Sequence, residues 1–206
     1  GVPAWCQMCM EMIVAHYKVN TIHDIWPNLG FFVHGGVAFE PYKKGFEKLL
    51  REPLTYIETY LASEGFIAFQ AQPGHAMRMV LNNGIFFEFV PFTDENFDAD
   101  GEIVANPTTY MIDQVKEGEN YALLLSTCAG AWRYLIGDVI KFVNKDANDI
   151  VITGRTKHYL SQCGEHLSVE NMNKALSQVA DEMDVTVREF AVAGIPEDTL
   201  FAHQWY

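Results

Sequence analysis

The chain has 206 residues, of which 49% are hydrophobic, and a formal net charge of −13 at pH 7. A chain of this length and apolar content buries a sizeable core, which excludes a disordered tail. The acidic balance excludes a nonspecific nucleic-acid binder, because a phosphate backbone requires clustered Lys and Arg.

The cysteines and the lack of a long apolar run bear on the compartment. No apolar run reaches the roughly eighteen residues of a membrane span, and no signal peptide is recognisable. Cys6 and Cys9 form a CxxC, which is compatible with a redox pair or half of a zinc site. A zinc site needs a second pair of ligands and a redox pair needs a strand upstream, so we favour reduced, structural thiols. We therefore expect a cytoplasmic protein that spans no membrane.

The first third of the chain predicts an α/β unit. An apolar, Met-rich segment at 3–17 predicts a largely buried helix with Pro3 in its first turn. A strand at 31–36 ends in a glycine pair and is followed by an amphipathic helix at 40–51. A β-rich run at 54–60 then gives way to a loop of small residues at 61–65, where ligands gather beyond the carboxyl ends of strands.

The rest of the chain predicts a succession of strands, which favours an antiparallel sheet or partial barrel. An acidic stretch at 93–106 predicts an exposed loop. Ser168 is expected to cap a helix that ends near Met183. The strands are expected at 66–71, 77–81, 85–90, 121–126, 139–143, 150–153, 185–193 and 200–206.

The segment 132–140, together with Gly154-Arg155 shortly after it, predicts a nucleotide site. Asp138 is a carboxylate that can accept hydrogen bonds from both ribose hydroxyls, and a guanidinium can face phosphate. Asp138 also lies in an apolar stretch, where an unpaired acid is costly to bury. It therefore needs a partner, and a salt bridge to Arg133 is the structural alternative to a ribose.

Four blocks of sequence occur in an order that identifies a family. The blocks are Tyr60-Leu61-Ala62-Ser63-Glu64-Gly65, Phe86-Phe87-Glu88-Phe89-Val90-Pro91, Thr127-Cys128-Ala129-Gly130-Ala131-Trp132-Arg133-Tyr134-Leu135-Ile136-Gly137-Asp138-Val139 and Gly154-Arg155. In these blocks the chain resembles the plant auxin-conjugating acyl-acid amido synthetases (the Gretchen Hagen family) and their bacterial relatives, within the adenylate-forming superfamily.

The resemblance implies an α/β adenylate-forming enzyme fold in two parts. Residues 1–156 would be the later part of the large N-terminal domain, with mixed sheets and a partial β-barrel, and residues 157–206 the beginning of a small, mobile α+β C-terminal domain. The phosphate loop and the distal catalytic lysine of the superfamily would lie outside the chain at either end. We therefore expect an incomplete domain pair that is inactive alone and contains no catalytic residue of its own.

The implied activity is that of an ATP- and Mg²⁺-dependent ligase. It would convert a carboxylic acid into an acyl-adenylate and then transfer the acyl group to an amine, which we expect to be an amino acid. Acyl-CoA synthesis is the alternative within enzymes, and a noncatalytic nucleotide-binding homologue is the alternative outside them. The expected partners are thus small molecules rather than nucleic acid or membrane.

The resemblance also implies roles for residues near the nucleotide. Tyr60 would lay its ring against adenine, Ser63 would lie in the same ATP-binding loop, Asp138 would bind the ribose, and Arg155 would lie near ribose and phosphate. Glu64 would hold Mg²⁺. The alternatives are a core tyrosine for Tyr60 and a turn-capping acid for Glu64.

Further positions are implied for the pocket floor and the hinge. Gly35 and Gly36 would let backbone approach ATP and the acyl group closely, unless they form a plain tight turn. Lys157 would be the hinge between half-reactions, unless it is a surface lysine. The neighbouring pair Gly164 and Glu165 resembles the loop that the hinge motion brings to the active site. His34 would line the acyl site or pack in the core.

Overall fold

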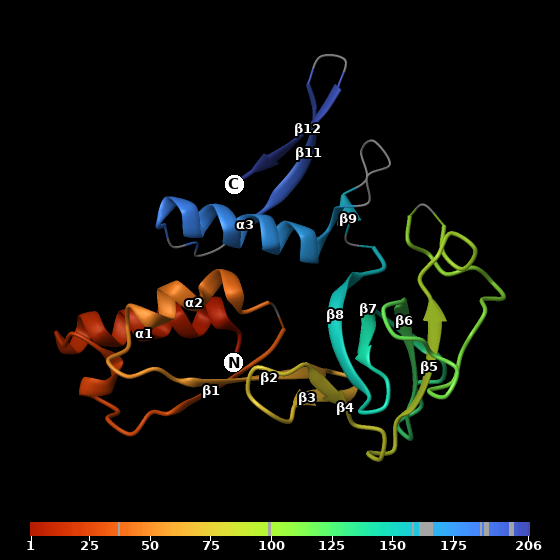
Figure 1. Cartoon of the computed structure of the whole chain (residues 1–206), viewed down its shortest axis with the longest axis horizontal. Coiled ribbons are helices and arrows are strands. Elements are labelled where there is room, and N and C mark those ends of the chain that lie inside the picture. The colour runs from red at the N-terminus through yellow and green to blue at the C-terminus, as the bar shows by residue number, and fades with distance from the viewer. Residues whose placement is uncertain are drawn as a thin grey trace. The chain divides into compact units, whose positions relative to one another are not determined.

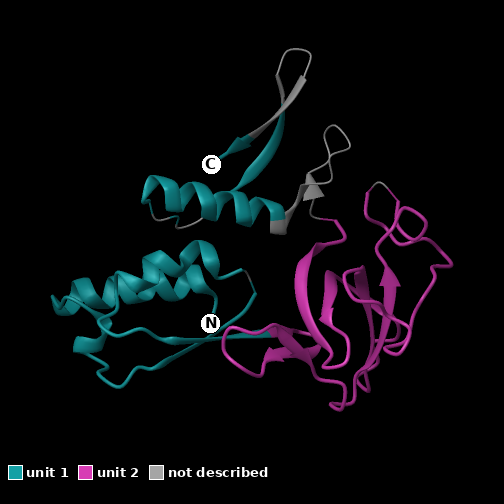
Figure 2. Cartoon of the chain, in the orientation of Figure 1, with its two compact units in different colours: residues 1–59, 162–165, 171–206 teal, residues 60–161, 166–170 magenta. Residues whose placement is uncertain are grey.

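A computed structural model describes residues 1–36, 38–98, 100–157, 159–160, 167–185, 187, 190–197 and 200–206. The chain divides into two compact units, and each is described by itself (Figure 2). Unit 1 comprises residues 1–59, 162–165 and 171–206, and unit 2 comprises residues 60–161 and 166–170.

Unit 1 contains most of the helices (Figure 1). Pro3 occupies the first turn of α1, as its fixed φ favours. The amphipathic face of α2 buries Tyr42 and Phe46 in a cluster with Ile22 and Phe39. The elements of this part of the chain are α1 (Pro3–Tyr17), the short helix η1 (Ile22–Asp24), β1 (Phe31–His34), α2 (Glu40–Glu47), the first part of β2 (Thr55–Ala62), α3 (Val169–Met183), β11 (Val192–Glu197) and β12 (Leu200–Trp205).

The prediction that α1 is largely buried is wrong. Trp5, Met8 and Met12 are each more than half exposed, and only Pro3, Gln7 and Met10 of the helix are buried. The buried side of α1 faces α2, where Gly45 leaves room for the side chain of Gln7. Apolar composition alone therefore did not fix the buried side of this helix.

β1 and β2 form a parallel pair in unit 1, in which Phe31 lies opposite Thr55 and His34 opposite Glu58. β2 continues into unit 2 as far as Ala62, so the loop predicted at 61–65 is shorter than expected. Ser63 and Glu64 instead form the tight turn between β2 and β3 (Gly65–Gln70).

The strands of unit 2 follow the spatial order β2, β3, β4, β8, β7, β6, β5. From β3 onward the ladders of described residue pairs are antiparallel, and the outermost strands do not pair with each other, so the described sheet is not closed into a barrel. The mixed α/β class is confirmed. The remaining strands are β4 (Met77–Met79), β5 (Phe86–Pro91), β6 (Asn120–Ser126), β7 (Tyr134–Asn144), β8 (Asp149–Arg155), β9 (Tyr159–Leu160) and β10 (Leu167–Ser168).

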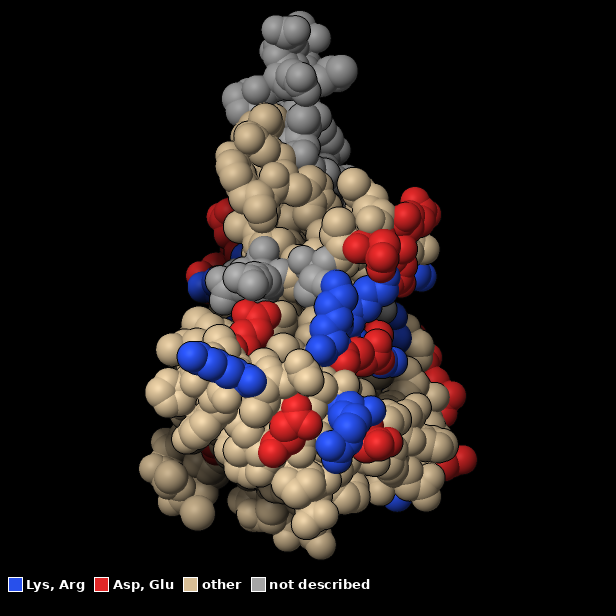
Figure 3. Space-filling model, turned by 90° about the vertical axis from the view of Figure 1, so that its left-hand side faces the viewer, with Lys and Arg blue, Asp and Glu red and all other residues tan. Residues whose placement is uncertain are grey.

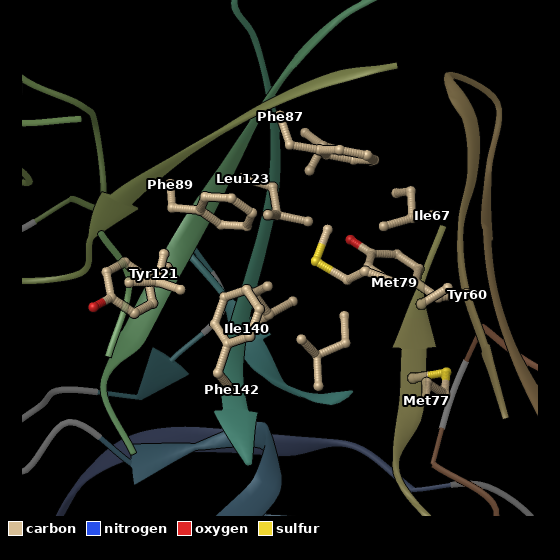
Figure 4. Close-up of a cluster of buried hydrophobic side chains, with 14 of the residues drawn as sticks. Tyr60, Ile67, Met77, Met79, Phe87, Phe89, Tyr121, Leu123, Ile140 and Phe142 are labelled. Carbon is tan, nitrogen blue, oxygen red and sulfur yellow. The ribbon is translucent and has the colours of Figure 1, made fainter. Parts of the chain in front are cut away.

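The larger core cluster of unit 2 lies on one face of its sheet, where side chains from β2 to β7 point toward one another (Figure 4). A smaller cluster, which includes Val90, Ala122 and Leu124, lies on the other face. Phe89, Tyr121 and Phe142 meet edge to face at the centre of the larger cluster, an arrangement that favours the ring quadrupoles. The position of Tyr60 in this cluster brings the end of β2 against β7.

The starts of two strands differ by several residues from the prediction. β7 begins at Tyr134 rather than 139, so the whole segment around Gly137-Asp138 lies within a strand. β11 begins at Val192 rather than near Val185. The acidic stretch at 93–106 is a loop as predicted, but Asn96 and Phe97 within it are buried.

No helix among the described residues is long and apolar enough to cross a membrane. On the face shown in Figure 3, basic and acidic side chains lie beside one another. Cys6 and Cys9 are free thiols on α1, and Cys128 is also free.

Candidate functional site

Asp138 on β7 lies at the centre of a cluster of polar side chains in unit 2. The ladder between β7 and β8 places it directly opposite Arg155. Its carboxylate accepts a hydrogen bond of 2.5 Å from the Tyr60 hydroxyl and forms an ion pair with Arg155 Nε at 3.3 Å. The Asp138 side chain is only 16% exposed. The sequence places these three residues far apart, and the sheet brings them together.

Gly137 makes room for this arrangement. Its φ of +85° lies in the left-handed region, which a residue with a Cβ rarely adopts. A Cβ there would also lie 3.2 Å from Nη2 of Arg155. Nη2 donates to the Ile136 carbonyl at 3.1 Å, and the Thr156 amide donates to the Gly137 carbonyl at 2.8 Å. The guanidinium is thus fixed across the backbone of β7.

Tyr60 takes part through its hydroxyl, because its ring packs beside Ile67 and Met79 in the core (Figure 4). Burial raises the pKa of this tyrosine far above its ordinary value, and the neighbouring Asp138 charge raises the pKa further. Tyr60 is therefore a neutral donor. A carboxylate has about four acceptor positions, so Asp138 retains acceptor capacity beside these two contacts.

Glu64 lies near this cluster, in the turn that follows β2. Its side chain is half-buried, and its charge contributes to raising the pKa of Tyr60, whereas Ser63 beside it is exposed. Within the described ranges, no three His, Cys, Asp or Glu side chains gather as a metal site. A single carboxylate still suits Mg²⁺, which keeps several waters and takes further oxygen ligands from phosphate.

The alternative of a salt bridge between Asp138 and Arg133 is wrong. Arg133 Nε pairs instead with Glu88 of β5 at 2.9 Å, and its backbone amide donates to Ser126 Oγ. Arg133 has a φ of +46° and precedes β7, which directs it away from the partner that sequence proximity indicated. The sequence did not indicate Glu88 as the partner of Arg133, because Glu88 lies in an aromatic run that predicts only a strand.

The Gly35-Gly36 pair lies in unit 1, where β1 ends. A Cβ at Gly35 would collide with the carbonyl oxygen of Thr59, so the close approach of β2 requires this glycine. Gly36 has a φ of +91°. These constraints account for both glycines, and their predicted contact with ATP remains a prediction.

His34 precedes this pair and is buried in unit 1. Its ring stacks on Phe39 at a centroid distance of 4.7 Å and on Phe32 at 5.6 Å, and its Nδ1 makes no hydrogen bond. Burial lowers the pKa of His34, which keeps the imidazole neutral. Of the two predictions for His34, these contacts fit packing in the core.

Lys157, the predicted hinge, forms an ion pair of 2.6 Å with Glu102. Glu102 follows Gly101 in the acidic loop. No sequence pattern indicated its contact with Lys157. Gly164 and Glu165 lie outside the described residues.

Comparison with known proteins was made by sequence and by fold. Residues 78–155 match the model of the GH3 family central domain. A probable indole-3-acetic acid-amido synthetase, GH3.6 of Oryza sativa subsp. japonica, is 31% identical over 129 residues, which are 59% of this chain and 26% of the relative. A jasmonoyl–L-amino acid synthetase, JAR4 of Nicotiana attenuata, is 30% identical over 58% of this chain and 21% of its own length. The chain thus spans about a quarter of these curated relatives.

The fold is also that of a solved relative. The GH3.15 acyl acid amido synthetase superposes with a TM-score of 0.66 and 17% identity, over 95% of this chain and 35% of its own. The same enzyme in complex with 2,4-DB superposes with a TM-score of 0.65 and 18% identity, over 89% of this chain and 32% of its own.

Proposed function

We propose that this chain, whose residues 78–155 match the model of the GH3 family central domain, belongs to an ATP-dependent acyl-acid amido synthetase. The complete enzyme would join a carboxylic acid to an amine, with an amino acid as the acceptor. One matched relative is named as an amido synthetase of indole-3-acetic acid and another as a jasmonoyl–L-amino acid synthetase, and these names support this substrate class.

The observation that carries the proposal is the environment of Asp138. Its carboxylate is largely buried yet keeps acceptor capacity, and Tyr60 and Arg155 fix its orientation. A fixed carboxylate of this kind suits the two hydroxyls of a ribose, since bidentate, charge-assisted hydrogen bonds are strong and directional. Arg155 is half exposed, so its guanidinium is available to a phosphate. Ser63, in the turn after β2 of the same unit, would complete this part of the ATP-binding set.

We assign Mg²⁺ to Glu64, the acid in the turn after β2. When bound, the metal would neutralise charge on the phosphates of ATP. The chain itself contributes the Glu64 carboxylate, and the neutral Tyr60 adds no negative charge beside it. Tyr60 is assigned to the adenosine end of ATP. Because its ring packs in the core, we assign its role to its hydroxyl, which orients the Asp138 carboxylate toward the ribose.

The chemistry needs activation because a carboxylate is a poor electrophile. A carboxylate oxygen of the acid would attack the α-phosphorus of ATP, forming an oxygen–phosphorus bond and releasing pyrophosphate. The amine would then attack the acyl carbon, lose a proton and expel AMP. Positioning and charge stabilisation are the contributions expected of the protein.

We further propose that residues 157–206 belong to the small mobile domain, that residues 1–156 belong to the large one, and that Lys157 is the hinge. Both the sequence resemblance and the position of Lys157, two residues after the end of β8, support this division.

The test is acid-dependent exchange of labelled pyrophosphate into ATP by the full-length protein, with a panel of aryl and alkyl acids. Amino acids and CoA are then supplied in turn to identify the acceptor. Exchange followed by amide formation is expected. A full-length protein that binds ATP but exchanges no pyrophosphate with any acid would refute the ligase, and thioester formation would refute the amine acceptor.

A further inference from the structure

The acidic loop of unit 2 packs against the segment that leaves β8. Asp98 organises the tip of this loop, because its Oδ1 accepts hydrogen bonds from the backbone amides of Asp100 at 3.0 Å and Glu102 at 2.8 Å. The Asp98 amide also donates to the Glu102 carbonyl at 3.0 Å, and Phe97 bridges to Ile103. The tip is thus a closed turn with its own hydrogen bonds.

Gly101 brings this turn into direct contact with the backbone at Thr156. It is buried and has a φ of +75°. A Cβ at Gly101 would collide with the Thr156 carbonyl oxygen and lie 3.2 Å from Cα of Lys157. Thr156 is itself 1% exposed, and its amide is held by the Gly137 carbonyl of β7. The backbone before Lys157 is therefore enclosed between the loop and the sheet.

Glu102 holds the side chain of Lys157 at the same place. The two groups lie 2.6 Å apart and are each more than half exposed, at 58% and 55%. An exposed ion pair is weak, because water screens it and two long side chains must be ordered. It can thus break and re-form without a large barrier.

We propose that residues 98 and 100–103 form a clasp on the hinge: Gly101 encloses the Thr156 carbonyl and Glu102 holds Lys157, so that the chain after β8 stays in one of its two catalytic poses until the pair breaks. The proposal rests on the hinge assigned above to Lys157. Glu102 acts through Lys157 and is thus a positioning residue. Backbone rotation at 156–157 moves the Lys157 side chain, whereas the Asp98 turn holds the backbone of Glu102 in place, so a change of pose separates the two charges.

A pair of matched variants tests the clasp in the full-length protein. Glu102→Gln removes the charge that holds Lys157, and Glu95→Gln removes an equal charge from an exposed position of the same loop. Limited trypsin digestion measures cleavage after Lys157, with cleavage after Lys145 as the internal reference. Glu102→Gln is expected to raise the relative rate after Lys157 by about two- to fivefold, which is the range of a weak exposed pair. Glu95→Gln should leave this rate at the wild-type value.

The second readout is the ratio of the acyl-transfer rate to the adenylation rate. Glu102→Gln should change this ratio by about two- to fivefold, and the charge swap Glu102→Lys with Lys157→Glu should restore it. Equal cleavage in the two Gln variants overturns the clasp, and so does an unchanged ratio with faster cleavage. Absence of pyrophosphate exchange refutes the proposed ligase. Digestion needs no activity, so the cleavage rates still decide in that case whether Glu102 holds the Lys157 segment.

Discussion

Replacing Asp138 by Asn tests the ribose site with little change of shape. A hydrogen bond to a charged acceptor contributes about 1.5–3 kcal/mol, and one between neutral groups about 0.5–1.5 kcal/mol. The lost charge thus costs roughly 1–1.5 kcal/mol of ATP binding, which corresponds to about five- to tenfold weaker affinity.

The structure indicates that this variant folds. An Asn oxygen at position 138 still accepts from the Tyr60 hydroxyl, whereas Ala would leave that buried hydroxyl without an acceptor, at a cost of about 1–3 kcal/mol. The ion pair with Arg155 is half exposed, so its loss costs less than about 1 kcal/mol of stability. Thermal unfolding should therefore shift by only a few degrees.

Asp149 provides the matched control. It pairs with Arg78 Nε at 3.0 Å, and the exposed fractions of this pair, 50% and 16%, equal those of Arg155 and Asp138. Asp149→Asn makes the same chemical change on the neighbouring strand, away from the proposed nucleotide. Calorimetric titration of the full-length protein with ATP should show weaker binding for Asp138→Asn alone. Equal ATP affinity in both folded variants and the wild type would refute the ribose assignment.

The remaining predictions concern the metal, the hinge, the chain by itself and a buried histidine. Glu64→Gln should leave the fold intact, lower the adenylation rate and raise the Mg²⁺ concentration for half-maximal rate; unaltered magnesium dependence in a pyrophosphate assay would make Glu64 structural. Lys157→Pro should leave adenylation in place while acyl transfer falls, because proline fixes φ near about −65°; equal loss of both steps would count against a hinge. The 206-residue chain alone should release no acid-dependent pyrophosphate, since it spans about a quarter of its curated relatives. Burial lowers the pKa of His34, so the unfolded state binds a proton at a higher pH than the folded state does. The stability due to neutral His34 is therefore complete above about pH 6.5 and is lost as pH falls toward the folded-state pKa. Urea unfolding at pH 5.5 and 7.5 should show a smaller pH difference in His34→Gln than in the wild type, and an equal difference would contradict this cause.

The sequence by itself determined the elements whose signals are local. The pattern at Tyr42 and Phe46 predicted α2, because side-chain periodicity follows directly from backbone geometry. Short apolar runs between turn signals, such as the one at 121–126, predicted most strands of unit 2. The order of sequence blocks from Tyr60 to Arg155 also indicated the family, since these residue types recur at fixed places along the chain.

Only the tertiary structure decided which side chains meet. Tyr60 and Asp138 are 78 positions apart, and Lys157 and Glu102 are 55 apart, so no local pattern relates them. Arg133 was the structural alternative to a ribose as the partner of Asp138, yet the register of β7 and β8 places Arg155 opposite Asp138. A strand pattern shows which face a residue lies on but not which residue of another strand lies opposite, because register depends on the packing of the whole sheet.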